Sequence, residues 1–154
     1  MDESRIDAAQ PAYWPEIRTL LLAAMCFFVF TIGIGMDATE IDRIELTIER
    51  YGDRFLRRIF TDGEIAYATK RRNPVPHFAG RFAAKEAAMK ALGTGHSRGV
   101  LWRDIEVVRA PGEAPQLRFH GGAARRFAFL KANSSLLTIT HSQTLAIAQV
   151  MLLL

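Results

Sequence analysis

The stretch HFAGRFAAKEAAMKALGTG at residues 77–95 decides the fold, because it joins the strongest helix signal of the chain to a clear stop. Alanine favours the helical conformation, and Gly93 is a natural residue for a helix C-terminus. One side of the helix carries large apolar residues, which predict a stripe buried in the core: Phe78, Phe82, Met89 and Leu92. We therefore expect a central helix over 77–92, followed by a glycine-rich loop over 93–99.

The same helix carries a cluster of charges around Glu86. Two pairs lie four residues apart and share a helix face, namely Arg81 with Lys85 and Glu86 with Lys90. One interpretation is a solvated face with ion pairs between neighbouring turns. The other is a site in which a carboxylate and several cations hold a metal-bound polyphosphate, with Glu86 as a magnesium ligand.

A second carboxylate, Asp37, follows the short motif GIG at residues 33–35. Residues 30–37 predict a buried strand whose two glycines permit close backbone contacts. Asp37 is a candidate second metal ligand, since magnesium in proteins takes one or two carboxylates. An Asp at the end of a strand also caps a following helix in many proteins, so both interpretations stay open.

Other motifs exclude several classes of enzyme. The loop that contains Gly93, Thr94 and Gly95 offers backbone N–H groups to a phosphate, but no GxxxxGK[ST] motif occurs, which excludes a Walker-type NTPase. The four histidines show no spacing typical of a metal site. Ser142 next to His141 lacks the surrounding motif of a nucleophile elbow.

The remaining segments predict an α+β fold. Helices are expected at 42–51, 61–70 and 121–130, and strands at 101–109, 116–120, 135–140 and 145–152. Gly52 is expected to end the first of these helices, and Thr61 with Glu64 forms a capping box at the start of the second. This order of elements favours a mainly antiparallel sheet with packed helices.

The composition is that of a single globular domain. The chain has 154 residues, of which 49% are hydrophobic and 23% are charged. Its formal net charge of +4 suits an anionic partner such as phosphate, nucleic acid or an acidic protein, without choosing among them. A single cysteine, Cys26, excludes an intrachain disulfide and a thiolate zinc cluster, and it is compatible with a reducing, cytoplasmic location.

Residues 1–29 differ in character from the rest of the chain, and they lead into the uncharged run LLLAAMCFFVF at residues 20–30. The run is borderline for a membrane anchor, which needs about 20 apolar residues. A signal peptide is disfavoured because acidic residues outnumber arginines before the run. We expect an extension that is disordered, appended or the product of a start assigned too far upstream. An intact mass that includes Met1 would contradict the hypothesis that the start is assigned too far upstream.

Arginines accumulate between residues 43 and 58 at spacings that approach helical periodicity: Arg43, Arg50, Arg54, Arg57 and Arg58. An ordinary solvated surface is one explanation. A docking patch for an acidic protein is another. Nucleic acid is not the expected partner, because no zinc finger, helix-turn-helix or aromatic RNA-binding signature is present.

Five segments together resemble the holo-acyl-carrier-protein synthase family of small 4′-phosphopantetheinyl transferases. They are GIGMDATEIDRIE (33–45), FTDGEIAY (60–67), AGRFAAKEAAMKALGTG (79–95), WRDIEVV (102–108) and LTITHSQTLAIAQVML (137–152). The resemblance covers about residues 31–154, so that 30–154 is the expected transferase domain. GRFAAKEA followed by KALGTG is its most specific part. The roughly thirty residues that precede GIG depart from the family pattern.

The resemblance implies a magnesium-dependent enzyme of fatty acid biosynthesis. Such an enzyme transfers the 4′-phosphopantetheine group from coenzyme A to a serine of apo acyl carrier protein and releases adenosine 3′,5′-bisphosphate. Asp37 and Glu86 match the metal ligands, and Glu86 or a water on the metal is the candidate base. Glu86 and Lys90 are the implied catalytic residues. The implied coenzyme A site comprises Arg81, Lys90, Gly93, Thr94, Gly95 and His141.

The resemblance also implies partners for the basic segment and for the chain itself. Arg43 matches the arginine that begins a docking helix for the acidic carrier protein. Family members of this size are trimers with sites between subunits, and a membrane is not expected to be involved. The alternative function is a non-catalytic basic binding module, for an acidic protein or nucleic acid, on the same fold.

Overall fold

The computed structural model describes residues 30–95 and 97–154, so the predicted extension at 1–29 lies outside the described residues. Strands and helices alternate irregularly along this part of the chain. In order they are β1 (Thr31–Glu40), α2 (Ile41–Ile59), α3 (Asp62–Thr69), α4 (Val75–Ala91), the 3-10 turn η1 (Trp102–Asp104), β2 (Ile105–Val108), β3 (Gln116–Phe119), α5 (Gly121–Phe129), β4 (Ser134–His141) and β5 (Leu145–Leu153).

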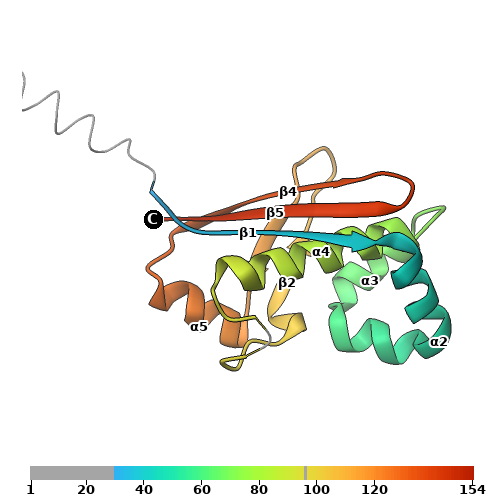
Figure 1. The fold of residues 1–154 in the computed structure, drawn as a ribbon, viewed down its shortest axis with the longest axis horizontal. Coiled ribbons are helices and arrows are strands. Elements are labelled where there is room, and N and C mark those ends of the chain that lie inside the picture. The colour runs from blue at the N-terminus through green and yellow to red at the C-terminus, as the bar shows by residue number, and fades with distance from the viewer. Residues whose placement is uncertain (1–29, 96) are drawn as a thin grey trace, which may run out of the picture.

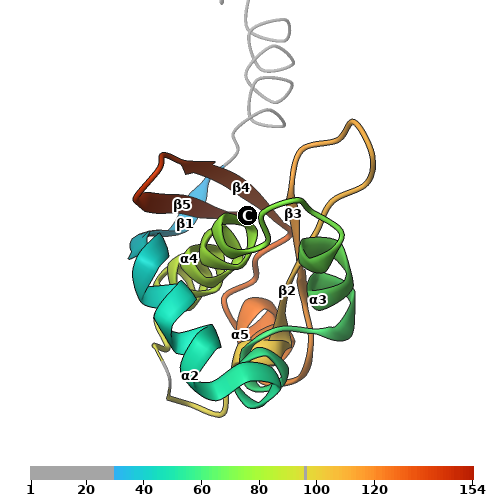
Figure 2. The same ribbon diagram turned by 90° about the vertical axis from the view of Figure 1, so that its right-hand side faces the viewer.

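A three-stranded antiparallel sheet in the order β1-β5-β4 forms one layer, and α4 lies across one face of it (Figure 1). Figure 2 shows α4 end-on beneath the sheet, with α2 on one side and α3 with the β2–β3 hairpin on the other. This arrangement is the α+β fold with an antiparallel sheet and packed helices that the sequence predicted. No helix of the described part of the chain is long and apolar enough to cross a membrane.

Helix α4 is buried on nearly all sides, which is more than the predicted single apolar stripe. Phe78, Met89 and Leu92 are buried as expected, but Arg81 and Lys85 are buried too. The alanines between them let the sheet, α2, α3 and β2 all approach the same helix. A solvated face with ion pairs is therefore wrong for Arg81 and Lys85.

Gly52 bends α2 instead of ending it. Its backbone, at φ 52° and ψ −135°, leaves the helical conformation, and the helix then resumes and continues to Ile59. The second half is stable because Leu56 and Ile59 are buried against the rest of the molecule. The predicted end at Tyr51 is thus wrong, since burial after the glycine outweighs the local break.

The predicted strand at 101–109 is shorter than expected. Residues Trp102–Asp104 form a 3-10 turn, and the strand runs only from Ile105 to Val108. The Asp104 carboxylate accounts for the turn, because its Oδ2 accepts hydrogen bonds from the amides of Leu101 and Gly122, at 3.0 Å each. The predicted hairpin with the following strand is confirmed, with Ile105 opposite Phe119.

Candidate functional site

Strand β1 places Asp37 against α4. A side chain at Gly33 or Gly35 would overlap the backbone of Ala91 or Ala87, so the two glycines let strand and helix touch, as the sequence predicted. Since side chains alternate along a strand, Asp37 lies on the same face as these glycines and points toward α4. The close contact thereby brings the Asp37 carboxylate to the flank of the helix.

Asp37 is held by two partners. The Lys90 ammonium lies 2.7 Å from Oδ1 of Asp37 and also donates a hydrogen bond to the carbonyl of Met36, at 3.0 Å. The hydroxyl of Thr39 donates to Oδ2 of Asp37, at 3.0 Å. Lys90, which the sequence places on one helix face with Glu86, thus contacts the neighbouring strand.

Asp37 and Glu86 line one pocket of about 500 Å³ between β1, α2 and α4. Arg43, at the start of α2, lines it as well, and Phe55, Phe82 and Leu145 contribute apolar surface. Among the described residues no three His, Cys, Asp or Glu side chains gather into a metal site. Two carboxylates at one pocket nevertheless suit magnesium, which in proteins keeps waters and phosphate oxygens as its other ligands.

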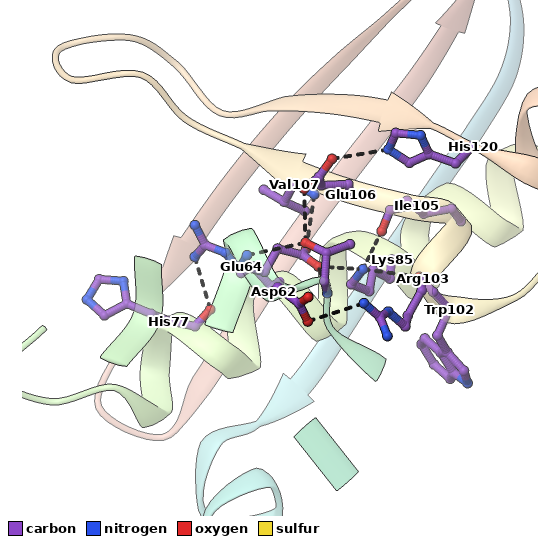
Figure 3. Close-up of polar contacts among 12 residues, drawn as sticks. Asp62, Glu64, His77, Lys85, Trp102, Arg103, Ile105, Glu106, Val107 and His120 are labelled. Atoms are coloured by element: carbon purple, nitrogen blue, oxygen red, sulfur yellow. Dashed lines mark hydrogen bonds and ion pairs between the residues drawn. The ribbon is translucent and has the colours of Figure 1, made fainter. Parts of the chain in front are cut away.

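A buried ion pair fixes how α4 is rotated (Figure 3). The Lys85 ammonium lies 2.8 Å from Oε2 of Glu64 on α3 and donates to the carbonyls of Trp102 and Ile105. Glu64 also accepts hydrogen bonds from the amides of Thr61, at 2.8 Å, and Val107, at 3.0 Å. Burial lowers the pKa of Lys85, and Glu64 opposes that effect. With Lys85 anchored, Glu86 faces the Asp37 pocket.

Arg81 and His141 line a second pocket of about 210 Å³ on the other flank of α4. The Arg81 guanidinium lies 3.9 Å from the centre of the Tyr67 ring, and Arg71 stacks on the same ring at 4.4 Å. The His77 ring lies 6.1 Å from that of His141. Burial lowers the pKa of His77, and the nearby Arg81 and Arg71 cations act in the same direction.

Within residues 30–95 and 97–154, the charges buried between α3 and α4 do not balance. Arg81 and Lys85 are two cations, whereas Glu64 is the buried carboxylate between them and is held by Lys85. Arg81 is only 5% exposed, its Nη1 donates to the carbonyl of His77, and its buried Nε has no hydrogen-bond partner among the described residues. A buried cation with an unsatisfied donor favours an anionic ligand in this pocket.

The two pockets lie on opposite flanks of α4 within one chain. The register pairs Asp37 with Ala148 and His141 with Ala146, so Asp37 and His141 lie on the two outer strands with β5 between them. The structure thus groups Asp37, Glu86 and Lys90 together, and groups Arg81 with His141 separately. In the part of the chain that the structure describes, the two groups line different pockets.

The glycine-rich loop continues from the end of α4. Gly93 and Gly95 adopt positive φ angles of 66° and 53°. Thr94 is buried, with its amide 3.1 Å from the carbonyl of Met89. These residues therefore form a tight turn at the end of the helix that carries Glu86 and Lys90.

Sequence reasoning missed three residues near these pockets. Thr39 holds Asp37, while Tyr67 and His77 line the Arg81 pocket. Thr39 lies two residues after Asp37 on the same strand face, so strand alternation could have found it. Tyr67 and His77 come from α3 and the first turn of α4, and only the tertiary structure shows that they meet.

The predicted arginine patch lies along α2, where all five side chains are exposed: Arg43, Arg50, Arg54, Arg57 and Arg58. Arg54 and Arg58 border a groove of about 510 Å³ whose apolar lining includes Tyr51, Phe55 and Trp102. Arg57 forms an exposed ion pair with Asp53 at 3.9 Å. An apolar groove with a cationic rim suits a protein partner with an acidic, partly apolar surface.

Comparison with known proteins assigns the chain to a family. The chain belongs to the 4′-phosphopantetheinyl transferase superfamily, whose family model matches residues 33–148. A holo-[acyl-carrier-protein] synthase of Solibacter usitatus is 49% identical over 121 residues, which cover 79% of this chain and 97% of that protein. One from a Methylobacterium species is 57% identical over 99 residues, covering 64% of this chain and 73% of that protein.

Solved structures with the same fold carry the same name. The holo-[acyl-carrier-protein] synthase of Neisseria meningitidis matches with a TM-score of 0.74 and 28% identity, over 80% of this chain and 98% of that one. That of Helicobacter pylori, solved in complex with coenzyme A, matches with a TM-score of 0.68 and 30% identity, over 77% and 98%. The family resemblance and the fold predicted from the sequence are thus confirmed.

Proposed function

We propose that this chain transfers the 4′-phosphopantetheine group of coenzyme A to a serine of apo acyl carrier protein, releasing adenosine 3′,5′-bisphosphate. Family membership makes the chain a phosphopantetheinyl transferase. The observation that carries the assignment of its reacting centre is the single pocket lined by Asp37 and Glu86, beside which Lys90 lies. Phosphoryl transfer requires positive charge near the reacting phosphate, and this pocket combines the Lys90 ammonium with two carboxylates that could hold a metal ion.

Asp37 and Glu86 are the proposed ligands of a magnesium ion. Both are carboxylates at one pocket, and the remaining ligands would be waters and phosphate oxygens. When bound, the metal would stabilise negative charge on the reacting phosphates. The other tasks belong to side chains of the protein.

Lys90 and Glu86 are the proposed catalytic residues. The Lys90 ammonium, half exposed beside the pocket, can bind the β-phosphoryl oxygens as charge develops on them. Glu86 lines the same pocket, and there it would accept the proton that the attacking serine hydroxyl must lose. The pocket opens beside Arg43, so a serine carried by a protein bound to α2 would approach from that side.

Arg81 and His141 are proposed to bind the nucleotide part of coenzyme A, with the turn of Gly93, Thr94 and Gly95 close to the phosphates. The unsatisfied Nε of buried Arg81 supports an anionic ligand in that pocket. Because Asp37 and Arg81 open on opposite flanks of one chain, a complete site requires a second chain.

A homotrimer with its sites between subunits would meet that requirement. The sheet face opposite α4 carries exposed apolar side chains, including Ile34 at 60%, Met36 at 62% and Leu136 at 56% exposed. Ile34, Met151 and Leu136 form one row across the three strands. An apolar sheet face of this kind favours association with further copies of the chain. The substrates, coenzyme A and an acidic carrier protein, are consistent with a cytoplasmic enzyme.

The test incubates the full chain with coenzyme A, Mg²⁺ and apo acyl carrier protein and follows the mass of the carrier. The wild type is expected to add one phosphopantetheine group. Asp37→Asn and Glu86→Gln should reduce turnover by at least about 100-fold, as loss of a charge-stabilising group at a reacting centre does. Glu113→Gln, an exposed carboxylate in the β2–β3 turn, is the matched control. A folded wild type that leaves the carrier unmodified would favour a non-catalytic binding module.

A further inference from the structure

Both carboxylate oxygens of Asp37 are already engaged in the structure. Oδ1 lies 2.7 Å from the Lys90 ammonium, and Oδ2 accepts the hydroxyl proton of Thr39 at 3.0 Å. The Asp37 side chain is only 16% exposed, so little of it faces water. Each oxygen keeps a further lone pair, but a cation that binds Asp37 would meet the positive charge of Lys90 2.7 Å from Oδ1 and would compete with it.

Lys90 is the partner that can leave. Its side chain is 50% exposed and ends a flexible four-carbon stem, so the ammonium can swing into solvent at small cost. Thr39 is buried in β1, opposite Ala146 of β5, and its position is fixed by the strand. A divalent cation at Asp37 would also repel the Lys90 ammonium directly.

A phosphate group is a suitable alternative binding partner for the Lys90 ammonium. An ammonium carries three donors, and here they serve the Asp37 carboxylate and the Met36 carbonyl. A phosphate offers several charged acceptor oxygens and so competes well with that pair. Binding of the phosphate and binding of the cation are then coupled through Lys90. A phosphate that binds Lys90 frees Asp37 for the cation, and a cation on Asp37 frees Lys90 for the phosphate.

We propose that Lys90 is a latch on the Asp37 carboxylate, so that a divalent cation binds tightly only after a phosphate ligand has taken over the lysine. The inference rests on the proposed function, since it concerns the same pocket. Coupling of this kind is reciprocal: the cation must strengthen phosphate binding by the same factor. The latch would keep the chain free of metal until coenzyme A arrives.

The first experiment measures binding of Mn²⁺ alone to the full chain by electron paramagnetic resonance of the free ion. Lys90→Met removes the latch and should bind Mn²⁺ at least about tenfold more tightly than the wild type, which corresponds to about 1.4 kcal/mol. Lys90→Arg keeps a cation on Asp37 and should stay near the wild type. Lys131→Met removes the same charge from α5's C-terminal end and should also stay near it.

The double variant Lys90→Met with Asp37→Asn shows where the ion binds, and the gain should vanish in it. Equal Mn²⁺ affinity of Lys90→Met and wild type would overturn the latch. An equal gain in Lys131→Met would also overturn it, since net charge alone would then explain the effect. Absence of Mn²⁺ binding in every variant would overturn both the latch and the metal site.

The second experiment measures binding of coenzyme A in the presence of EDTA by calorimetry. Asp37→Asn releases Lys90 and should tighten binding more than Glu86→Gln, which removes the same charge from the same pocket while Lys90 keeps Asp37. An equal effect of both variants would contradict the latch. If no variant binds coenzyme A, the proposed function fails, while the Mn²⁺ comparison still decides the latch on its own.

Discussion

At the scale of single residues, Gly35 determines whether Asp37 reaches its pocket. A methyl group there would lie 2.7 Å from the backbone nitrogen of Ala91 and would overlap the carbonyl of Ala87. These neighbours are backbone atoms of a packed helix and cannot turn aside as a side chain would. The contact between β1 and α4 is therefore a condition for placing Asp37 beside Lys90.

Gly35→Ala should push the strand away from α4. We expect a loss of about 1–3 kcal/mol in the free energy of unfolding, as overpacking costs, together with a fall in transferase activity. Gly63→Ala is the matched control, because its new methyl group would meet its nearest heavy atom, Oε1 of Glu106, at 3.4 Å. Urea denaturation measures the first quantity, and equal stability of the two variants would show that the helix can shift freely.

At the scale of elements, a polar network joins α3 to the β2–β3 hairpin (Figure 3). Oε1 of Glu106 accepts the hydroxyl proton of Thr61 at 2.9 Å, and Oε2 lies 3.1 Å from Nε2 of His120. Burial acts to raise the pKa of Glu106, but the hydrogen bonds from His120 and Thr61 outweigh it and lower that pKa below 4.5. The Glu106 carboxylate is thus stabilised in the folded chain.

This shift predicts how stability depends on pH. Folding lowers the pKa of Glu106, so its carboxylate contributes to the free energy of unfolding above about pH 4.5. This contribution is lost as the pH falls through the pKa that Glu106 has in the folded chain. Glu106→Gln should therefore be less stable than the wild type at neutral pH, and the difference should shrink in acid. Thermal melts from neutral pH to about pH 3 measure it, and a constant difference would contradict the assignment.

The exposed arginines of α2 predict a separate effect on the carrier protein. Arg54→Glu and Arg58→Glu should raise the KM for apo acyl carrier protein at least about tenfold and leave the KM for coenzyme A unchanged. The reason is that a charge on the docking surface affects only the association with the carrier protein. Arg125→Glu, exposed on α5 at the other end of the molecule, should change neither (Figure 1). An equal change in both KM values would instead indicate damage to the pocket.

At the scale of the whole molecule, the proposed site between subunits predicts complementation between chains, because the Asp37 pocket and the Arg81 pocket lie on opposite flanks of α4. Asp37→Asn and His141→Ala should each be weak alone, whereas a co-expressed mixture should recover activity. If every site combines two chains at random, about a quarter of the sites would hold both native residues. Activity of the purified mixture measures this recovery. Activity no higher than the mean of the two variants would place both residues in one chain's site.

Much of the fold was predictable because the signals are local. The alanine-rich α4, the capping box of Thr61 and Glu64 and the β2–β3 hairpin each depend on neighbouring residues, and each is present in the structure. The approach of β1 to α4 was also predictable, since two glycines in a strand leave room for another backbone.

The features that could not be predicted depend on contacts between distant segments. The spacing of Arg81 and Lys85 predicts that they share a helix face, but it does not reveal which neighbour covers that face. In the structure, Glu64 on another helix covers Lys85. The continuation of α2 past Gly52 follows from burial of Leu56 and Ile59, which a local pattern does not reveal. The pairing of Lys90 with Asp37 likewise needs the contact of β1 with α4.

The start of β1 and the end of β5 lie side by side at one end of the sheet, and this has a practical consequence. The amide of Leu154 donates a hydrogen bond to the carbonyl of Phe30 at 2.9 Å, so the last residue lies beside the start of β1. Figure 1 shows this end of the sheet at the opposite side of the molecule from α2. A chain immobilised on a sensor chip through its C-terminus would therefore present the arginine patch of α2 outward, so that carrier-protein binding could be measured directly.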